Sequence, residues 1–209
     1  MTIVLNATTG ISTPPVTVLG DTSGSISIVA PAVAGTNTQT LLAATGTLSP
    51  FNSDTAKAST SGTSVEFTGI PNWVRRITVM LNGVSTSGGS LVQIQLGTGS
   101  TSYTTSGYVG GANVFTGSGV GTNTFTSGFV TEGTSGGITS STVRHGIVTI
   151  ALVTGNTWVA SGVLQHTGTT TAGSTAGSIA LAAALTAVRV TTVNGTDTFD
   201  AGNINVLYE

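Results

Sequence analysis

From residue 65 onward, apolar and polar residues alternate in short runs, which is the pattern of half-buried β-strands. The runs include "SVEFTGI", "WVRRITVMLNG", "LVQIQLG", "HGIVTIALVTG" and "NINVLYE". Glycine-containing turn signals separate them about every ten residues. This spacing predicts roughly eight to ten short strands, and therefore a β-sandwich or barrel, for residues 65–209.

One strand begins unusually, with a tryptophan and two adjacent arginines. In "WVRRITVML", alternation places Ile77, Val79 and Leu81 on the core face and Arg76 on the opposite face. The simpler interpretation is that Trp73 packs over an edge of the sandwich with Arg75 beside it. The alternative is that Trp73, Arg75 and Arg76 form a binding site for an anionic or aromatic ligand.

Three connections carry distinct signals. Thr154-Gly155-Asn156 predicts a tight link between two strands, and Asn194-Gly195 is the strongest short hairpin signal. The run "IALAAALTAV", residues 179–188, favours helix by its Ala and Leu content, but its flanks predict that it is mostly strand. Residues 97–121 are rich in Gly and Ser and predict a long exposed excursion.

The first 49 residues differ from the rest. They hold short apolar pieces such as "TIVLN" and "VTVLG", separated by Gly and Pro. Because a lone two-stranded ribbon is marginal in water, we expect these pieces to pair with identical copies in other subunits. The domain prediction is therefore a stalk or docking arm over 1–49, a polar linker over 50–64, and a sandwich head over 65–209.

Composition narrows the class of protein. The 209 residues are 38% hydrophobic and only 6% charged, with a net charge of -2 and no cysteine. Nucleic acid is an unfavourable partner for so few positive charges. The longest uncharged apolar run is about half of a membrane span, so no membrane insertion is expected. The N-terminus lacks the basic region of a signal peptide, and the absence of Cys suits a reducing cytoplasm.

Catalytic and metal-binding candidates are sparse. "GTSGG" around Ser135 fits a nucleophile motif only formally, because no acid lies between it and either histidine. The two nearest carboxylates, Asp197 and Asp200, suit turn capping better than glycan cleavage. A metal site at His145 or His166 requires three copies of the same histidine to meet on a trimer axis. We therefore expect no enzyme activity, no cofactor and no metal in the chain itself.

Three phrases carry a resemblance to a known group. "SVEFTGIPNWVRRITVMLNGVS", "GNTWVASGVLQH" and "AVRVTTVNGTDTFDAGNINVLYE" resemble the C-terminal domain of tailed-bacteriophage virion proteins labelled tail fibre or structural protein. The N-terminal 49 residues are similar to a segment that precedes such domains. The resemblance covers most of the chain, and "FDAGNINVLYE" is its most specific part.

The resemblance implies a jelly-roll-like head on a short, intertwined, homotrimeric β stalk at the outer surface of the virion, made in the host cytoplasm. The sequence departs from a full tail fibre in having no long shaft and no separate tail-attachment domain, and a short stalk with one head suits a spike on a shell. We therefore expect a capsid decoration, or cement, protein whose partners are its own copies and the major capsid or tail proteins. The alternative is a tail-fibre tip that attaches to a host surface glycan. The candidate surface contacts are Tyr103, Tyr108, Trp73 and Arg75.

Overall fold

The computed structural model describes residues 16–19, 25–28, 51–134 and 138–209. The chain divides into two compact units, Met1–Thr47 and Leu48–Glu209. In the first unit β1 (Val16–Leu19) and β2 (Ser25–Ile28) form an antiparallel pair in which Val16 lies opposite Ile28. Both strands were expected from their apolar pieces. Pairing with other copies stays a prediction.

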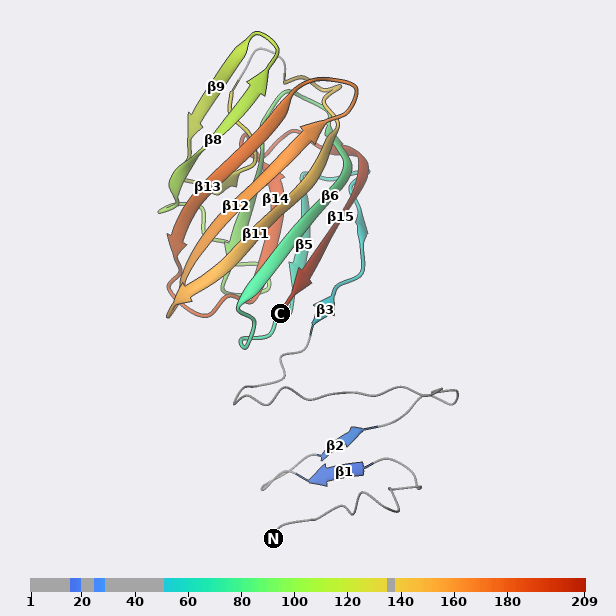
Figure 1. The fold of residues 1–209 in the computed structure, drawn as a ribbon, viewed down its shortest axis with the longest axis vertical. Coiled ribbons are helices and arrows are strands. Elements are labelled where there is room, and N and C mark those ends of the chain that lie inside the picture. The colour runs from blue at the N-terminus through green and yellow to red at the C-terminus, as the bar shows by residue number, and fades with distance from the viewer. Residues whose placement is uncertain (1–15, 20–24, 29–50, 135–137) are drawn as a thin grey trace, which may run out of the picture. The chain divides into compact units, whose positions relative to one another are not determined.

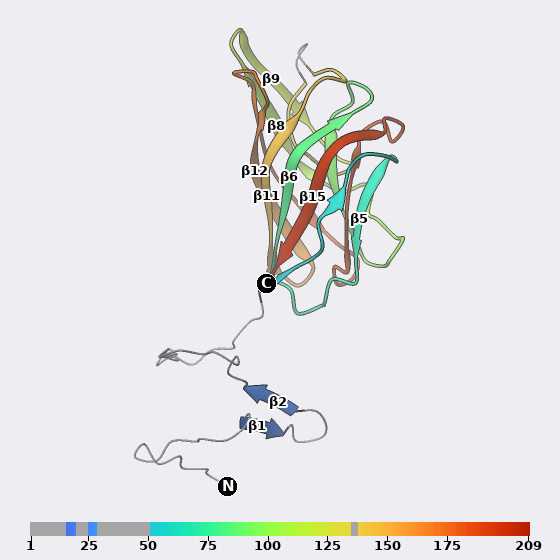
Figure 2. The same ribbon diagram turned by 90° about the vertical axis from the view of Figure 1, so that its right-hand side faces the viewer.

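The second unit is a sandwich of two antiparallel sheets (Figures 1 and 2), which confirms the predicted all-β class. The smaller sheet has the order β10-β7-β14-β5. Its strands are β5 (Ser64–Thr68), β7 (Val92–Gly97), β10 (Phe129–Val130) and β14 (Ala187–Thr192).

The larger sheet has nine strands in the order β3-β15-β6-β11-β12-β13-β8-β9, with β4 also paired to β15. It lies toward the viewer in Figure 1, in front of β14 and β5. Its strands are β3 (Asn52–Ser53), β4 (Lys57–Ala58), β6 (Arg76–Thr86), β8 (Val109–Thr116), β9 (Gly119–Thr124), β11 (Arg144–Thr154), β12 (Thr157–His166), β13 (Ala172–Ala180) and β15 (Phe199–Tyr208).

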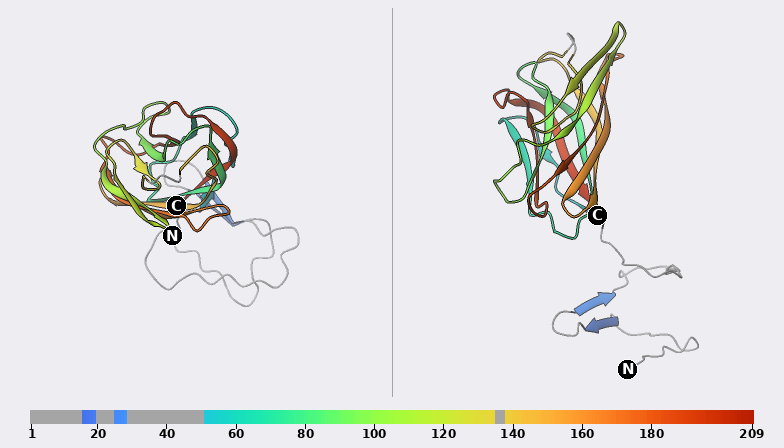
Figure 3. Two further views of the ribbon diagram at one scale, coloured as in Figure 1. Left: turned by 90° about the horizontal axis from the view of Figure 1, so that it is seen from above. Right: turned by 90° about the vertical axis from the view of Figure 1, so that its left-hand side faces the viewer.

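The core fills the space between the two sheets, which Figure 3 shows edge-on in its right panel. Every second residue of the long strands points into it, as alternation requires. Ile77, Val79 and Leu81 of β6 are buried, and Arg76 is exposed, as the sequence predicted. From the smaller sheet, Ile94 and Val190 face them and are fully buried.

The predicted linker contributes to the sandwich. Within residues 50–64, β3 and β4 pair with β15, and Ser59 Oγ donates a hydrogen bond of 2.8 Å to the Ala201 carbonyl. Backbone pairing of this kind ties the segment to the last strand of the larger sheet. It therefore belongs to the same compact unit as the head.

The link through Thr154, Gly155 and Asn156 is confirmed as the turn between β11 and β12. Thr154 pairs with Thr157, and Gly155 adopts a φ of 54°, which glycine accepts without strain. The hairpin expected at Asn194-Gly195 is wrong. Gly195 does make a turn with a φ of 69°, but β14 and β15 on either side belong to different sheets.

Two further expectations are corrected. Residues 181–186 are not a strand, because the chain crosses there from β13 in one sheet to β14 in the other, and Leu181 and Leu185 are buried at the crossing. Residues 97–121 are not one exposed excursion. Residues 109–116 form β8 and residues 119–121 begin β9, and these two strands pair at the end of the larger sheet.

Candidate functional site

A polar groove lies on the outer side of the smaller sheet. Alternation along β7 turns Ile94 inward and Gln93 and Gln95 outward, and on β14 it turns Arg189 and Thr191 outward in the same way. The register then sets Arg189 opposite Gln95 and Thr191 opposite Gln93. Polar side chains from two neighbouring strands are thereby brought into one row.

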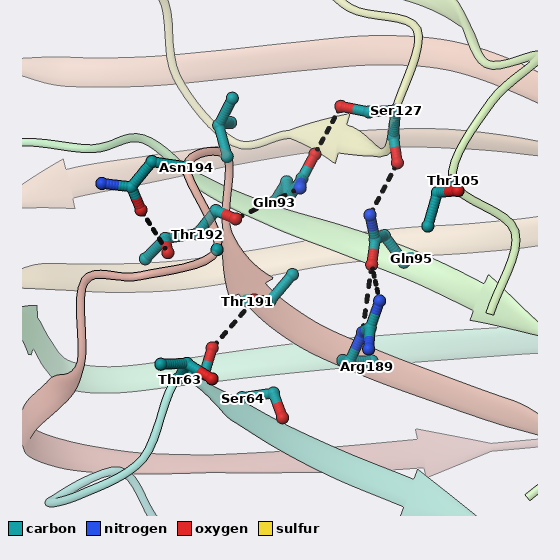
Figure 4. A pocket seen from close by; sticks show the side chains of 12 residues that line it. Thr63, Ser64, Gln93, Gln95, Thr105, Ser127, Arg189, Thr191, Thr192 and Asn194 are labelled. Carbon is teal, nitrogen blue, oxygen red and sulfur yellow. Dashed lines mark hydrogen bonds between the residues drawn. The ribbon is translucent and has the colours of Figure 1, made fainter. Parts of the chain in front are cut away.

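Hydrogen bonds fix the side chains of this row (Figure 4). Gln95 Oε1 accepts bonds from Arg189 Nε at 3.0 Å and Nη2 at 2.5 Å, while Gln95 Nε2 donates to the Ser127 carbonyl at 2.8 Å. Ser127 Oγ donates to Gln93 Oε1 at 3.0 Å, and Gln93 Nε2 donates to the Thr192 carbonyl at 3.3 Å. Both glutamines are almost fully buried, so their amide orientations are set before any ligand arrives.

The groove has a volume of about 330 Å³. Hydroxyl and amide groups dominate its walls, and Arg189 is the one charged residue among them. Its lining residues are Thr63, Ser64, Gln93, Gln95, Thr105, Ser127, Arg189, Thr191, Thr192, Val193, Asn194 and Gly195. Such a surface suits a neutral, hydroxyl-rich ligand better than an ionic one.

Tyr103 borders this region from the loop after β7. Its ring lies 4.3 Å from the Arg189 guanidinium carbon, a cation–π contact, and its backbone bridges to Gly97. Burial, followed by the nearby Glu66 carboxylate, raises the pKa of Tyr103 to about 12, although the Arg189 charge opposes the change. Tyr103 thus remains a candidate surface contact.

Tyr108 is corrected from a surface contact to a core residue. Only 1% of it is exposed, and its ring packs edge-on against Phe129 at 4.9 Å. Its hydroxyl accepts a hydrogen bond from the Leu96 backbone N–H at 2.8 Å, and burial raises its pKa to about 12. Tyr103 and Tyr108 therefore lie on opposite sides of β7, and only Tyr103 faces outward.

Trp73 and Arg75 lie at the beginning of β6, beside the C-terminus. The Trp73 ring is half-buried and tilted against Tyr208 at 6.2 Å, which confirms that it packs over an edge of the sandwich. The Arg75 and Arg76 backbone N–H groups both donate to the Glu209 carbonyl, at 2.7 and 2.9 Å. Arg75 is exposed and its guanidinium donates to the Asn72 and Val74 carbonyls.

A buried ionic cluster of Glu132, Arg144 and His166 is the feature that the sequence did not reveal. Arg144 Nε donates to Glu132 Oε1 at 2.5 Å, and His166 Nε2 lies 2.6 Å from Glu132 Oε2. Glu132 and Arg144 have no exposed surface. The β-carbon of any residue other than glycine at position 173 would lie 2.6 Å from Glu132 Cβ, so Gly173 makes room for the carboxylate.

Opposing effects set the protonation of Glu132. Burial alone raises the pKa of its carboxyl, but the hydrogen bond from His166 and the charge and hydrogen bond of Arg144 outweigh burial and hold the pKa below its usual value. The ionised carboxylate is thus the form that the fold stabilises. A cluster so enclosed supports structure, since no ligand reaches it.

The lowered pKa of Glu132 predicts acid sensitivity. The unfolded carboxyl titrates near its usual pKa of about 4.3. The stabilisation from Glu132 is therefore complete above that pH and is lost as the pH falls through the lower, folded value. We expect the free energy of unfolding, measured in urea between pH 7 and pH 2.5, to fall steeply below about pH 4.5. The free energy of unfolding of a Glu132→Gln variant should fall less steeply over the same pH range. Equal slopes for the variant and the wild type would contradict the lowered pKa of Glu132.

The other titratable candidates have structural partners. Asp197 Oδ2 accepts from the Ser90 backbone N–H at 2.9 Å, and its Oδ1 accepts from Asn194 Nδ2 at 2.8 Å, which bears out turn capping. The Asp200 carboxylate accepts a bond from Ser85 Oγ. His145 Nδ1 accepts from the Gly83 backbone N–H at 3.2 Å. Ser135 lies outside the described residues.

The outer side of the larger sheet has a different character. On the described strands β11, β12, β13, β8 and β9, the one residue of the types Asp, Glu, Lys and Arg is Arg144, which points into the core. We call the outward side of these five strands the uncharged face. Of the nine large hydrophobic side chains exposed in the described residues, seven belong to it: Val109, Phe115, Val120, Ile147, Val153, Val159 and Val163.

Comparisons with known proteins add no evidence on function, so the evidence comes from the polar groove and the uncharged face. No protein-family model, curated protein or solved structure matches the chain. Among the described residues, no group of three or more His, Cys, Asp or Glu side chains is arranged to hold a metal ion. The same part of the chain has no helix of the length and apolarity needed to cross a membrane.

Proposed function

We propose that this chain is a non-enzymatic structural protein of a tailed-bacteriophage particle, that it assembles as a homotrimer, and that it decorates and stabilises the capsid shell. The observation that carries the proposal is the uncharged face. This face carries seven exposed large apolar side chains among Ser, Thr, Asn and Gln residues, and on the described strands it presents no Asp, Glu, Lys or Arg. Depletion of charge together with exposed apolar groups is typical of the core of a protein interface. A surface of this kind suits a protein whose role is to assemble.

Two finer features of the fold belong to this proposal. The first is a jelly-roll-like winding, which we infer because the chain passes from one sheet to the other between β5 and β6 and again between β14 and β15. The second is the intertwined stalk predicted for residues 1–49, most of which lie outside the described residues. Support comes from β1 and β2, since an isolated two-stranded ribbon is marginal and gains stability when other copies add strands.

Decoration would stabilise the shell by mass action. A protein that binds the assembled shell and not its dissociated subunits shifts the equilibrium toward assembly. The resemblance of the C-terminal phrase "FDAGNINVLYE" to virion surface proteins adds a reason to place the chain on a phage particle. The partners are then further copies of this chain and the major capsid protein.

The location of the protein on intact particles tests this proposal. Antibody against the chain, visualised by gold label in negative-stain images, is expected over the whole shell. Particles that lack the protein are expected to lose their DNA at a lower temperature than complete particles. Label confined to the tail would overturn the decoration role.

The polar groove favours a second candidate function, attachment to a host surface glycan by a tail-fibre tip. Its walls offer fixed amide and hydroxyl groups, and Tyr103 adds an aromatic ring beside Arg189. Groups of these kinds hold sugar hydroxyls and the apolar faces of sugar rings. The groove is the part of the sandwich that the decoration role leaves unused.

Binding of the purified chain to host cells tests the second function. If the groove binds a glycan, Gln95→Ala is expected to weaken cell binding at least tenfold, because it removes the amide that positions Arg189. Asn203→Ala is the matched control, since Asn203 is an exposed amide residue on β15 of the other sheet, outside the uncharged face. Equal binding by both variants and the wild type, or no binding at all, would remove this candidate.

A further inference from the structure

The uncharged face has a definite relief. Along β13 the outward residues are small: Ala172, Ser174, Ala176 and Ser178. Of the eight residues paired with them, four are large and apolar, and the other four are Ser161, Gln165, Gly111 and Asn113. Val159 and Val163 of β12 lie opposite Ser178 and Ser174, and Val109 and Phe115 of β8 lie opposite Ser178 and Ala172. We call this row of small residues on β13 the trough, and the four larger apolar residues beside it the ridge residues.

The size of the face is that of a stable interface. The five strands contain 11, 10, 9, 8 and 6 residues. With strands about 4.8 Å apart and a rise of about 3.3 Å per residue, they cover roughly 700 Å² in projection. A standard protein interface buries about 800 Å² of accessible surface on each partner. Since accessible surface exceeds its projection, one face has about the area that a partner buries in a standard interface, and around a three-fold axis this area is shared between two neighbours.

The charge pattern identifies the occupant. A partner with a charged surface would have to desolvate its charges against a face that offers no counter-charge. A second copy of the same face brings no Asp, Glu, Lys or Arg to the contact, and His145 at the start of β11 is the titratable side chain that it presents.

We infer that the uncharged face is the surface through which the heads of this protein pack against one another. This contact rests on the homotrimer of the proposed function, and it is the surface that holds the three heads together. The ridge residues Val159 and Val163 lie near the middle of that contact, next to the trough over β13. The polar groove lies on the opposite side of the sandwich, so packing of the heads leaves the groove accessible to a ligand.

The first test places a charge on the ridge of the full-length chain. Val163 is 60% exposed, so Val163→Glu does not disturb the core of the monomer. Light scattering with size-exclusion chromatography is expected to give a trimer for the wild type. For Val163→Glu, the protein concentration below which the trimer dissociates should be at least tenfold higher than for the wild type. Val193→Glu, at an exposed valine outside the face, is the matched control and is expected to stay trimeric.

The second test uses the absence of cysteine from the chain. A single thiol introduced by Ser174→Cys in the trough should react with maleimide at least tenfold more slowly in the assembled protein than in the diluted monomer. Ser118→Cys, in the exposed turn between β8 and β9, should react equally fast in both. This measurement stays informative even if Val163→Glu impairs folding.

The outcomes separate this inference from the proposed function. A wild-type chain that is monomeric at tens of micromolar, or a trimer that survives Val163→Glu with the Ser174→Cys thiol freely reactive, overturns the inference. Protection of that thiol only on phage particles would show that the shell covers the face, and this also overturns it. Head packing without any location on a particle would instead remove the proposed function alone.

Discussion

Replacing Glu132 by alanine is expected to lower the free energy of unfolding by about 3–5 kcal/mol, because it leaves the fully buried Arg144 without its counter-charge. Urea denaturation at pH 7, followed by circular dichroism, measures the loss. Glu66→Ala is the matched control. Glu66 lies near the surface, 3.9 Å from Arg189, and its removal should cost less than about 1 kcal/mol.

A double variant shows whether the loss comes from the uncompensated charge. Glu132→Leu combined with Arg144→Met removes both charges and leaves apolar groups of similar size. We expect the double variant to be more stable than Glu132→Leu alone, since a buried arginine without a partner is worse than no arginine. A double variant less stable than the single one would show that Arg144 is held by other contacts.

Replacing Phe129 by alanine is expected to cost about 3–5 kcal/mol through lost burial and the cavity that remains. Phe129 has no exposed surface, and its ring makes edge-on contacts with Tyr108 at 4.9 Å and Phe125 at 6.0 Å. Urea denaturation again measures the change. Phe51→Ala makes the same chemical change at a site that is 65% exposed. It should alter stability by no more than about 0.5 kcal/mol, and equal losses would contradict the packing described for Phe129.

The buried ionic cluster shows where sequence reasoning stops. Glu132 follows β10, Arg144 begins β11 and His166 ends β12, so they are separated along the chain and come from different elements. Nothing in their local sequence marks them as partners, because alternation indicates which face a residue occupies and not what lies opposite. The rarity of charge in this chain was the available signal, since a charged residue at an inward position of a predicted strand requires a partner.

The polar groove was predictable only in its parts. Alternation in "LVQIQLG" places Gln93 and Gln95 on one face, and "AVRVTTV" places Arg189 and Thr191 on one face. The pairing of β7 with β14 makes a groove of them, and that pairing joins residues far apart in sequence. Tyr103 and Tyr108 looked alike in a Gly-rich segment. Strand β8, which lies between β13 and β9, begins directly after Tyr108, and the Tyr108 ring is buried in the core.

The sequence by itself determined the all-β class, the faces of the strands and the turn at Gly155, because alternation and glycine preferences act between residues that are close neighbours. Only the tertiary structure decided which strands share a sheet. Because β13 and β15 belong to one sheet and β14 to the other, the chain crosses between the sheets at residues 181–186 and again after Asn194. It also brought together the ionic cluster, the polar groove and the uncharged face. Each of these depends on the register between distant strands, which is set by the packing of the whole core and not by any local segment.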